Sequence, residues 1–133
     1  MIYPKHVAVI PDGNRTRAKL NGKDLSEAYM TSYEKSFDII RYTFTNTDSK
    51  VVTLRGLSTE NTKNRPKEEF DFLMNMYKFI GDELDTFLIT NKVNFRTVGN
   101  MSGITEEFKE YLTAKEERTK CDSDRYLIFA LNY

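Results

Sequence analysis

The chain has 133 residues, a length that predicts one domain spanning residues 1–133. Its 20 basic and 20 acidic side chains cancel, which argues against a general nucleic-acid-binding protein but allows a local anion site. A single cysteine excludes a framework of intrachain disulfides and suits a reducing, cytoplasmic compartment, and no apolar run reaches the roughly 20 residues that span a membrane.

Short apolar runs alternate with longer helical patterns along the chain. The runs predicted as strands are residues 6–10, 51–57, 93–98 and 126–133, and the helical patterns span about 24–48, 66–90 and 105–120. Asp24 and Glu27 are spaced as in a capping box, and Pro66 suits the first turn of the second helix. The β-α-β-α-β-α-β order predicts an α/β fold with a mostly parallel central sheet flanked by helices.

The helix predicted at 66–90 is apolar on two sides. One stripe contains Phe70, Leu73, Met74, Tyr77, Leu84 and Leu88, and the other contains Phe72, Met76, Phe79 and Phe87. A helix of this kind is typical of one buried between layers; the alternative is that one side lines an apolar cavity. The charged run 106–120 is predicted to be a solvent-exposed helix face.

The first strand ends in an unusual turn, Pro-Asp-Gly-Asn at 11–14, with cationic side chains behind it. Gly13 can take a positive φ and let the backbone approach a ligand, and backbone N–H groups beside arginines suit a phosphate. Asp12 would repel a bare phosphate, a conflict that Mg²⁺ resolves because it bridges carboxylates and diphosphates. The alternative is an Asx-turn in which Asp12 and Asn14 bond their own backbone.

A second polar cluster follows the second strand. Ser58, Thr59, Glu60 and Asn61 come directly after it, and Arg65 precedes the next helix. The carboxyl ends of parallel strands share one edge, where ligands bind in such folds. Two polar turns at that edge, both with arginines that can bind phosphate in a bidentate manner, predict a diphosphate site. The alternative is a loop that caps the following helix.

The residues that match a known family cover nearly the whole chain. They are HVAVIPDGNR at 6–15, Ala18-Lys19, LSTEN at 57–61, RPKEEFDFLM at 65–74, NKVNFRTVGN at 91–100 and LIFALNY at 127–133. In these segments the chain resembles the cis-prenyltransferases, the undecaprenyl diphosphate synthase family. The resemblance implies a Mg²⁺-dependent condensation of an allylic diphosphate, such as farnesyl diphosphate, with isopentenyl diphosphate. The cis-polyprenyl product would extend into a hydrophobic tunnel between helices and sheet.

The resemblance also implies roles for individual residues. Asp12 would be the essential catalytic carboxylate near Mg²⁺ and the diphosphate, and Asn61 would assist proton removal. The substrate-binding residues would be Gly13, Asn14, Arg15, Thr16, Arg17, Ser58, Thr59, Glu60 and Arg65, with Thr16 and Arg17 at positions where the family has arginine and tryptophan. The candidates for limiting product length are Phe72, Met76, Phe79 and Phe87.

The chain departs from the family pattern at several points. Leu25 and Tyr29 stand near the family's arginine and histidine positions, so two groups that would hold diphosphate are replaced. After Tyr133 the family continues with Gly-Gly-Arg and further arginines that bind isopentenyl diphosphate. The chain is therefore expected to be incomplete at its C-terminus, as a fragment or as a protein that needs a partner.

Two alternatives to a self-sufficient enzyme remain open from the residues. One is a non-catalytic or partner-dependent subunit of a prenyltransferase complex, and the other is a general phosphate-binding α/β module. A homodimer or hetero-oligomer is expected from the resemblance. Peripheral membrane contact is expected only because long products are apolar.

Overall fold

The structure is a computed structural model that describes residues 2–11, 25–56 and 67–131, with only the backbone at 25–26 and 68–70. Its elements are β1 (His6–Val9), α2 (Leu25–Asn46), β2 (Val51–Arg55), α4 (Lys67–Thr90), β3 (Asn94–Gly99), α5 (Glu106–Thr119) and β4 (Tyr126–Leu131). This order confirms the predicted alternation of strands and helices. The predicted helix start at Asp24 and the residue Pro66 lie outside the described residues.

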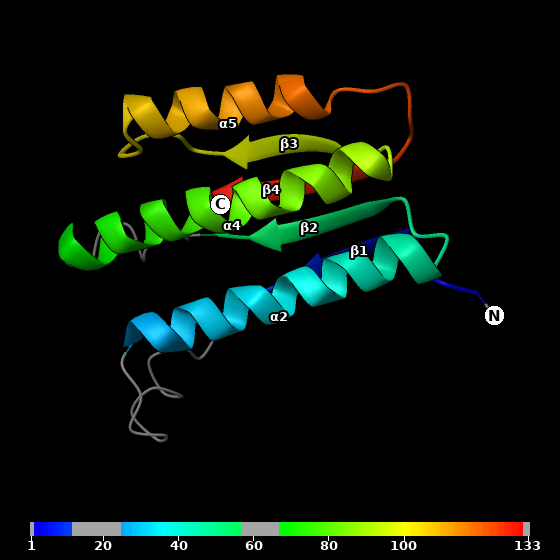
Figure 1. The fold of residues 1–133 in the computed structure, drawn as a ribbon, viewed down its shortest axis with the longest axis horizontal. Coiled ribbons are helices and arrows are strands. Elements are labelled where there is room, and N and C mark those ends of the chain that lie inside the picture. The colour runs from blue at the N-terminus through cyan, green and yellow to red at the C-terminus, as the bar shows by residue number, and fades with distance from the viewer. Residues whose placement is uncertain (1, 12–24, 57–66, 132–133) are drawn as a thin grey trace.

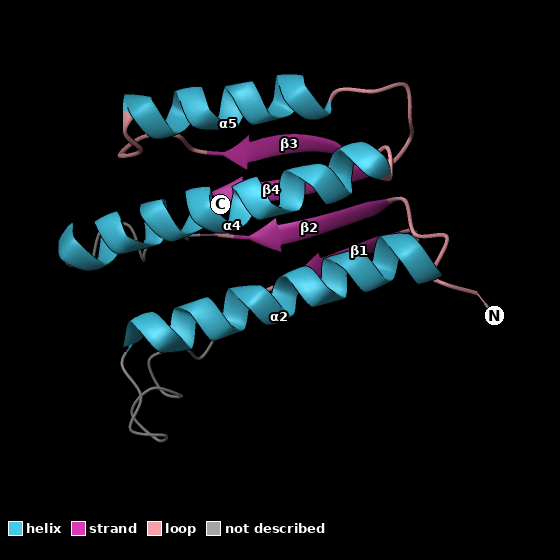
Figure 2. Cartoon of the chain, viewed as in Figure 1, coloured by secondary structure: helices cyan, strands magenta, loops and turns pink. Residues whose placement is uncertain are grey.

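All four described strands run parallel in one sheet with the order β1-β2-β4-β3 (Figure 1). The last strand of the chain is therefore inserted between β2 and β3. Leu54 of β2 is in register with Val9 of β1 on one side and with Phe129 of β4 on the other. Because the strands are parallel, their carboxyl ends lie at one edge of the sheet, as the arrowheads in Figure 2 show.

The hydrophobic core lies between the sheet and the helices. Side chains alternate along β2, so that Val52 and Leu54 are buried while Thr53 and Arg55 on the opposite face remain partly exposed. In the view of Figure 1, α2 and α4 lie over the sheet, and α5 lies alongside β3. No helix within the described residues is both long and apolar enough to cross a membrane.

Helix α4 buries every described side chain of one apolar stripe and buries the other stripe only in part. The buried residues of the first stripe are Leu73, Met74, Tyr77, Leu84 and Leu88, while the side chain of Phe70 lies outside the described set. In the second stripe Met76 is buried, but Phe79 is 58% exposed. The expectation that α4 is buried on both sides is therefore wrong, because α4 covers the sheet with one face and meets solvent on the side of Phe79.

Helix α5 protects the outer edge of the sheet. Its N-cap, Thr105, accepts a hydrogen bond from the Phe108 N–H at 3.2 Å. The edge strand β3 turns two backbone N–H groups towards α5: the Phe95 N–H donates to Thr119 Oγ1 at 2.9 Å, and the Thr97 N–H donates to Glu116 Oε1 at 2.8 Å. These side chains accept hydrogen bonds from backbone N–H groups that an exposed edge strand would otherwise offer to a strand of another chain.

Candidate functional site

The two predicted diphosphate-binding turns lie outside the described residues. They contain Asp12, Gly13, Asn14, Arg15, Thr16 and Arg17 in the first turn, and Ser58, Thr59, Glu60, Asn61 and Arg65 in the second. The structure does describe the strands that lead into them. β1 and β2 are paired with Val9 opposite Leu54, so the chain leaves both strands at the same edge. The roles of these residues remain predictions.

Two glycines, Gly56 and Gly99, allow the neighbouring chain segments to pack closely against β4 at the carboxyl edge of the sheet. The Gly56 N–H donates to Ala130 O at 2.7 Å, and a Cβ at Gly56 would lie 2.7 Å from a Leu131 methyl carbon. Gly99 has a φ of +116°, and a Cβ there would lie 1.8 Å from the Leu131 carbonyl oxygen. Only glycine fits at position 99, because both the backbone conformation and the available space exclude a side chain.

A pair of tyrosines joins α2 to α4 beneath this edge. The hydroxyls of Tyr33 and Tyr77 lie 2.9 Å apart, and the Tyr33 hydroxyl lies 3.5 Å from the carbonyl oxygen of Arg55 at the end of β2. The two rings pack edge to face with centroids 5.2 Å apart, and Tyr77 packs in the same way on Phe129 at 5.1 Å. This arrangement places aromatic walls directly under the edge from which the predicted turns depart.

An apolar cavity of about 40 Å³ lies between the helices and the sheet. Its walls are Tyr33 and Phe37 of α2, Tyr77, Ile80, Gly81 and Leu84 of α4, Phe108, Tyr111, Leu112 and Lys115 of α5, and Leu54, Phe95, Leu127 and Phe129 of the sheet. The four residues predicted to limit product length, Phe72, Met76, Phe79 and Phe87, have described side chains, and none of them lines the cavity. Their role in limiting product length stays a prediction, and α4 faces this cavity with the stripe that contains Tyr77.

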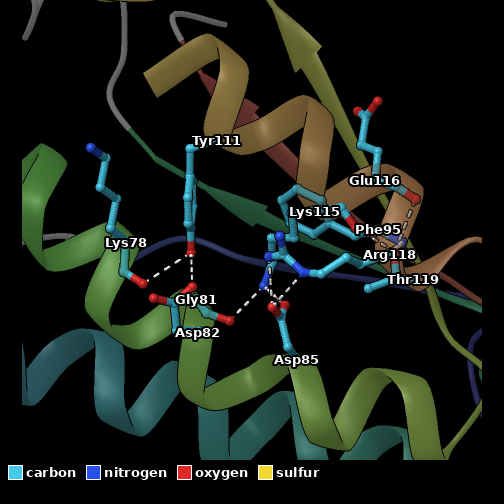
Figure 3. Close-up of polar contacts among 10 residues, drawn as sticks. All are labelled: Lys78, Gly81, Asp82, Asp85, Phe95, Tyr111, Lys115, Glu116, Arg118 and Thr119. Carbon is cyan, nitrogen blue, oxygen red and sulfur yellow. Dashed lines mark hydrogen bonds and ion pairs between the residues drawn. The ribbon is translucent and has the colours of Figure 1, made fainter. Parts of the chain in front are cut away.

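A buried lysine, Lys115, lines the cavity, and Figure 3 shows its polar contacts with α4. Lys115 is 2% exposed, and its Nζ donates to the Gly81 carbonyl oxygen at 2.5 Å and forms an ion pair with Asp85. The same ammonium lies 5.1 Å from the centre of the Phe95 ring. On its other oxygen, Asp85 accepts hydrogen bonds from Arg118 at 2.7 and 3.2 Å. The expectation of a wholly solvent-exposed charged run at 106–120 is therefore wrong at Lys115.

The spacing of residues along α5 indicates this burial, although the composition of the charged run does not. Phe108, Leu112, Lys115 and Thr119 are the buried positions of α5, and their spacing follows one face of a helix. Burial lowers the pKa of Lys115, while the hydrogen bond and charge of Asp85 oppose that shift. The lysine is thus a polar group in an apolar wall, stabilised by fixed partners.

Tyr111 occupies the neighbouring turn of α5. Its hydroxyl lies 2.9 Å from both the Lys78 carbonyl oxygen and Asp82 Oδ1 on α4. Burial raises the pKa of Tyr111, and the hydrogen bond to Asp82 raises it further. A Cβ at Gly81 would lie 2.6 Å from this hydroxyl, so the missing side chain at Gly81 allows α4 and α5 to approach closely.

Two further predictions concern the positions where the family has arginine and histidine, and the metal site. Tyr29, at the predicted histidine position, is buried in the hydrophobic core, and the side chain of Leu25 lies outside the described set. Among the described residues, no group of three histidine, cysteine or acidic side chains is placed to bind a metal. The predicted magnesium ligand Asp12 lies outside these residues, so its assignment remains a prediction.

The chain is similar to known proteins over nearly its whole length. Residues 10–133 match a family model described as "Putative undecaprenyl diphosphate synthase". The chain is 37% identical over 130 residues to an isoprenyl transferase of Helicobacter pylori, covering 97% of this chain and 54% of that protein. It is 35% identical to a Micrococcus luteus ditrans,polycis-undecaprenyl-diphosphate synthase specific for (2E,6E)-farnesyl diphosphate, covering 98% and 51%.

A solved structure shows the same fold. The chain superposes with a TM-score of 0.85 and 30% identity on lavandulyl diphosphate synthase from Lavandula x intermedia, which was solved in complex with dimethylallyl diphosphate. The match covers 97% of this chain and 55% of that one. The chain therefore spans about half the length of the relatives it matches.

Proposed function

Because the chain belongs to the undecaprenyl diphosphate synthase family, we propose that it takes part in joining an allylic prenyl diphosphate to isopentenyl diphosphate to form a cis-polyprenyl diphosphate. The observation that carries this proposal is the parallel pairing of β1 and β2, which leaves the polar segments after both strands at one edge of the sheet. The apolar, aromatic walls beneath that edge suit hydrocarbon, and the cavity of about 40 Å³ between them would have to widen to admit a prenyl chain. The polar turns that follow β1 and β2 suit its diphosphate.

In the proposed site, Asp12 is the ligand of Mg²⁺. A carboxylate together with diphosphate oxygens is a donor set that this hard cation prefers, and the bound ion would neutralise charge on the leaving diphosphate. Arg15, Arg17 and Arg65 donate hydrogen bonds to diphosphate oxygens. Asn61 assists removal of a proton from the isopentenyl unit, and the remaining residues, Gly13, Asn14, Thr16, Ser58, Thr59 and Glu60, orient the two substrates.

Binding of farnesyl diphosphate, measured by calorimetry with and without Mg²⁺, tests this assignment. We expect Asp12→Ala to weaken the Mg²⁺-dependent binding by about 10- to 100-fold, the size of a lost charged interaction. Asp122→Ala, at an exposed position after α5, is the matched control and should bind like wild type. Equal binding by wild type and Asp12→Ala would reject the role of Asp12. Displacement of farnesyl diphosphate by ATP would favour a general phosphate-binding module.

The residues at two family positions support a second proposal, that activity depends on a partner. Leu25 and Tyr29 stand near the positions where the family has arginine and histidine, and Tyr29 is buried in the hydrophobic core. A second copy or a different subunit would then supply diphosphate-binding groups, and apolar products would bring the assembly to a membrane surface. Transfer of labelled isopentenyl units should be absent for the chain alone and should appear when a full-length relative is added. Robust product from the chain alone would reject this dependence.

A further inference from the structure

We propose that the sheet face turned away from the helices binds a small amphipathic anion, with an aliphatic body and a single carboxylate or phosphate head group. This inference concerns a surface separate from the cavity and goes beyond the proposed function. The site is an open groove of about 510 Å³, a volume within the range of small-molecule sites. All four described strands contribute to its walls, which include Ile10, Arg55, Val98 and Ile128.

The groove lies on a face that the described helices leave uncovered. Leu54 and Phe129 line the cavity on the helix side, whereas Thr53, next to Leu54, lines the groove on the opposite side. In Figure 1 this opposite side lies behind the sheet, away from α2 and α4. Ile10 is 55% exposed there and Val98 is 38% exposed. Because parallel sheets are normally covered on both faces, this apolar surface is available to another molecule.

Arg55 lies among apolar side chains in this groove. It is in register with Ala130 of β4, which is in turn in register with Val98 of β3. The short side chain of Ala130 stands between the longer ones of Arg55 and Val98, so the face is hollowed at this point. Ile128, two residues before Ala130 on the same face, extends the apolar wall. The groove therefore offers one cation beside a surface for hydrocarbon.

The guanidinium of Arg55 has no partner within the described part of the chain. The hydrogen bond that Arg55 accepts from Tyr33 reaches its carbonyl oxygen, and its side chain forms no ion pair with a described residue. The described strands contain no aspartate or glutamate. A purely apolar molecule would cover this charge without replacing its water. An anionic head group would instead accept charge-assisted hydrogen bonds from it.

The other polar side chains of the groove have already formed a hydrogen bond with each other. His6 Nε2 and Thr53 Oγ1 lie 2.6 Å apart. An aliphatic body can cover this pair without leaving a buried donor or acceptor unsatisfied. Arg55 is thus the lining residue that sets the requirement for an anion, while the apolar walls set the requirement for a hydrocarbon body.

Two other occupants of this face are less favourable. A second copy of the chain would bring its own Arg55 to the contact, and neither copy would offer a carboxylate from the described strands. The guanidinium groups would then be covered without partners. A membrane of anionic lipids supplies the same chemistry as a single amphiphile. We favour the single amphiphile because the surface is hollowed between the strands rather than flat.

An NMR titration that follows the backbone amides of the full chain, without Mg²⁺, measures the place and the affinity of binding together. The probes are decyl phosphate, decanoate and decanol, each kept below the concentration at which it aggregates. We expect the two anions to shift the amide signals of Ala8 and Ile128. They should bind at least about tenfold more tightly than decanol, the effect of a charge-assisted hydrogen bond. Inorganic phosphate, which lacks the aliphatic body, should bind at least about tenfold more weakly than decyl phosphate.

Three variants test the role of Arg55. Arg55→Gln removes the charge and should bind decyl phosphate and decanol alike, whereas Arg55→Lys keeps the charge and should still prefer the anions. Arg96→Gln is the matched control on the same face. Arg96 lies outside the groove lining and already donates to the Phe95 carbonyl oxygen at 2.8 Å, so this variant should bind like wild type. Thermal unfolding establishes that each variant is folded.

Each outcome supports or overturns the inference. Loss of the preference for anions in Arg55→Gln, with an unchanged Arg96→Gln, supports it. Equal losses in the two variants, or amide shifts confined to cavity residues such as Tyr77 and Leu84, overturn it.

The other occupants give results of their own, and each would overturn the inference. Binding to vesicles of phosphatidylglycerol and phosphatidylcholine, without binding of the monomeric probes, would assign the face to a lipid surface. Sedimentation of the chain as a dimer that Ile128→Glu dissociates would assign it to a second copy. None of these measurements requires Mg²⁺ or the residues proposed to bind diphosphate, so the proposed function is tested separately.

Discussion

Gly99 shows how strongly one residue is constrained at the carboxyl edge. Its φ is +116°, and an added Cβ would lie 1.8 Å from the carbonyl oxygen of Leu131. We expect Gly99→Ala to lower the free energy of unfolding by about 3 kcal/mol or more, because strain and a backbone clash act together. Urea denaturation measures this loss.

Gly103 provides the matched control for that substitution. It also has a positive φ, of 81°, but it is exposed in the turn before α5. Gly103→Ala should cost about 1 kcal/mol, from conformational strain alone. Equal losses in the two variants would show that the contact with Leu131 does not constrain position 99.

Tyr111 supports a prediction about pH. Tyr111→Phe removes a hydroxyl that lies 2.9 Å from Asp82 and from the Lys78 carbonyl, and should lower the free energy of unfolding by about 1 kcal/mol at pH 7. The pKa of Tyr111 is raised above its ordinary 10.0 mainly by burial. The folded state therefore keeps a proton that the unfolded state loses above pH 10, and the hydroxyl's contribution declines as the pH rises beyond 10.

The difference in stability between wild type and Tyr111→Phe should consequently narrow above pH 10. Chemical denaturation at several pH values from neutral to alkaline measures it. Tyr42→Phe, at a residue that is 63% exposed on α2, is the control and should change stability by less than about 0.5 kcal/mol. A constant difference at all pH values would contradict the assigned direction of the pKa shift.

The residue types at the predicted site were readable without a structure, whereas Lys115 was not recognised. Asp12, Asn61 and Arg65 belong to short motifs, which can be recognised from the order of residues along the chain. The charged run predicts that Lys115 is exposed to solvent, although it is only 2% exposed. Its burial requires Gly81 and Asp85, which come from a different helix, so local composition alone pointed the wrong way.

At the scale of elements, α5 stabilises the sheet because its side chains accept hydrogen bonds from backbone N–H groups of the edge strand β3. Thr119→Val keeps the shape of the side chain but removes the acceptor of the Phe95 N–H. The N–H would then be buried without a partner, so we expect a loss of about 1–3 kcal/mol in the free energy of unfolding. Hydrogen exchange at the Phe95 amide should accelerate in parallel.

Thr113 provides the control on the same helix. It is exposed on α5, and Thr113→Val makes the same chemical change in a helical position. The free energy of unfolding of Thr113→Val should stay within about 0.5 kcal/mol of the wild-type value. Unaltered exchange at Phe95 in Thr119→Val would show that α5 does not protect this edge through Thr119.

Most element boundaries followed from local patterns. The predicted strand at 51–57 corresponds to β2 (Val51–Arg55), and the predicted helix at 105–120 corresponds to α5 (Glu106–Thr119), because apolar periodicity and capping residues are local properties. The apolar stripes of α4 were identified correctly, but not which stripe faces the cavity. That choice depends on how α4 packs on the sheet between its neighbours.

At the scale of the whole molecule, the strand order β1-β2-β4-β3 has no counterpart in any local pattern. Each strand is an apolar run that could pair with any other. Which pairs form depends on how the described strands and helices bury their apolar faces together. The order also decides that Leu54 and Phe129 become neighbours and that both line the cavity.

The sequence by itself determined the alternation of strands and helices, the family segments and the residue types proposed to bind diphosphate. These depend on spacing and on short motifs, which are properties of neighbouring residues. Only the tertiary structure decided the strand order, the cavity and its walls, the steric demand at Gly99 and the burial of Lys115 against Asp85. Each of these arises from contacts between residues far apart in the chain, and such contacts exist only once the helices pack on the sheet.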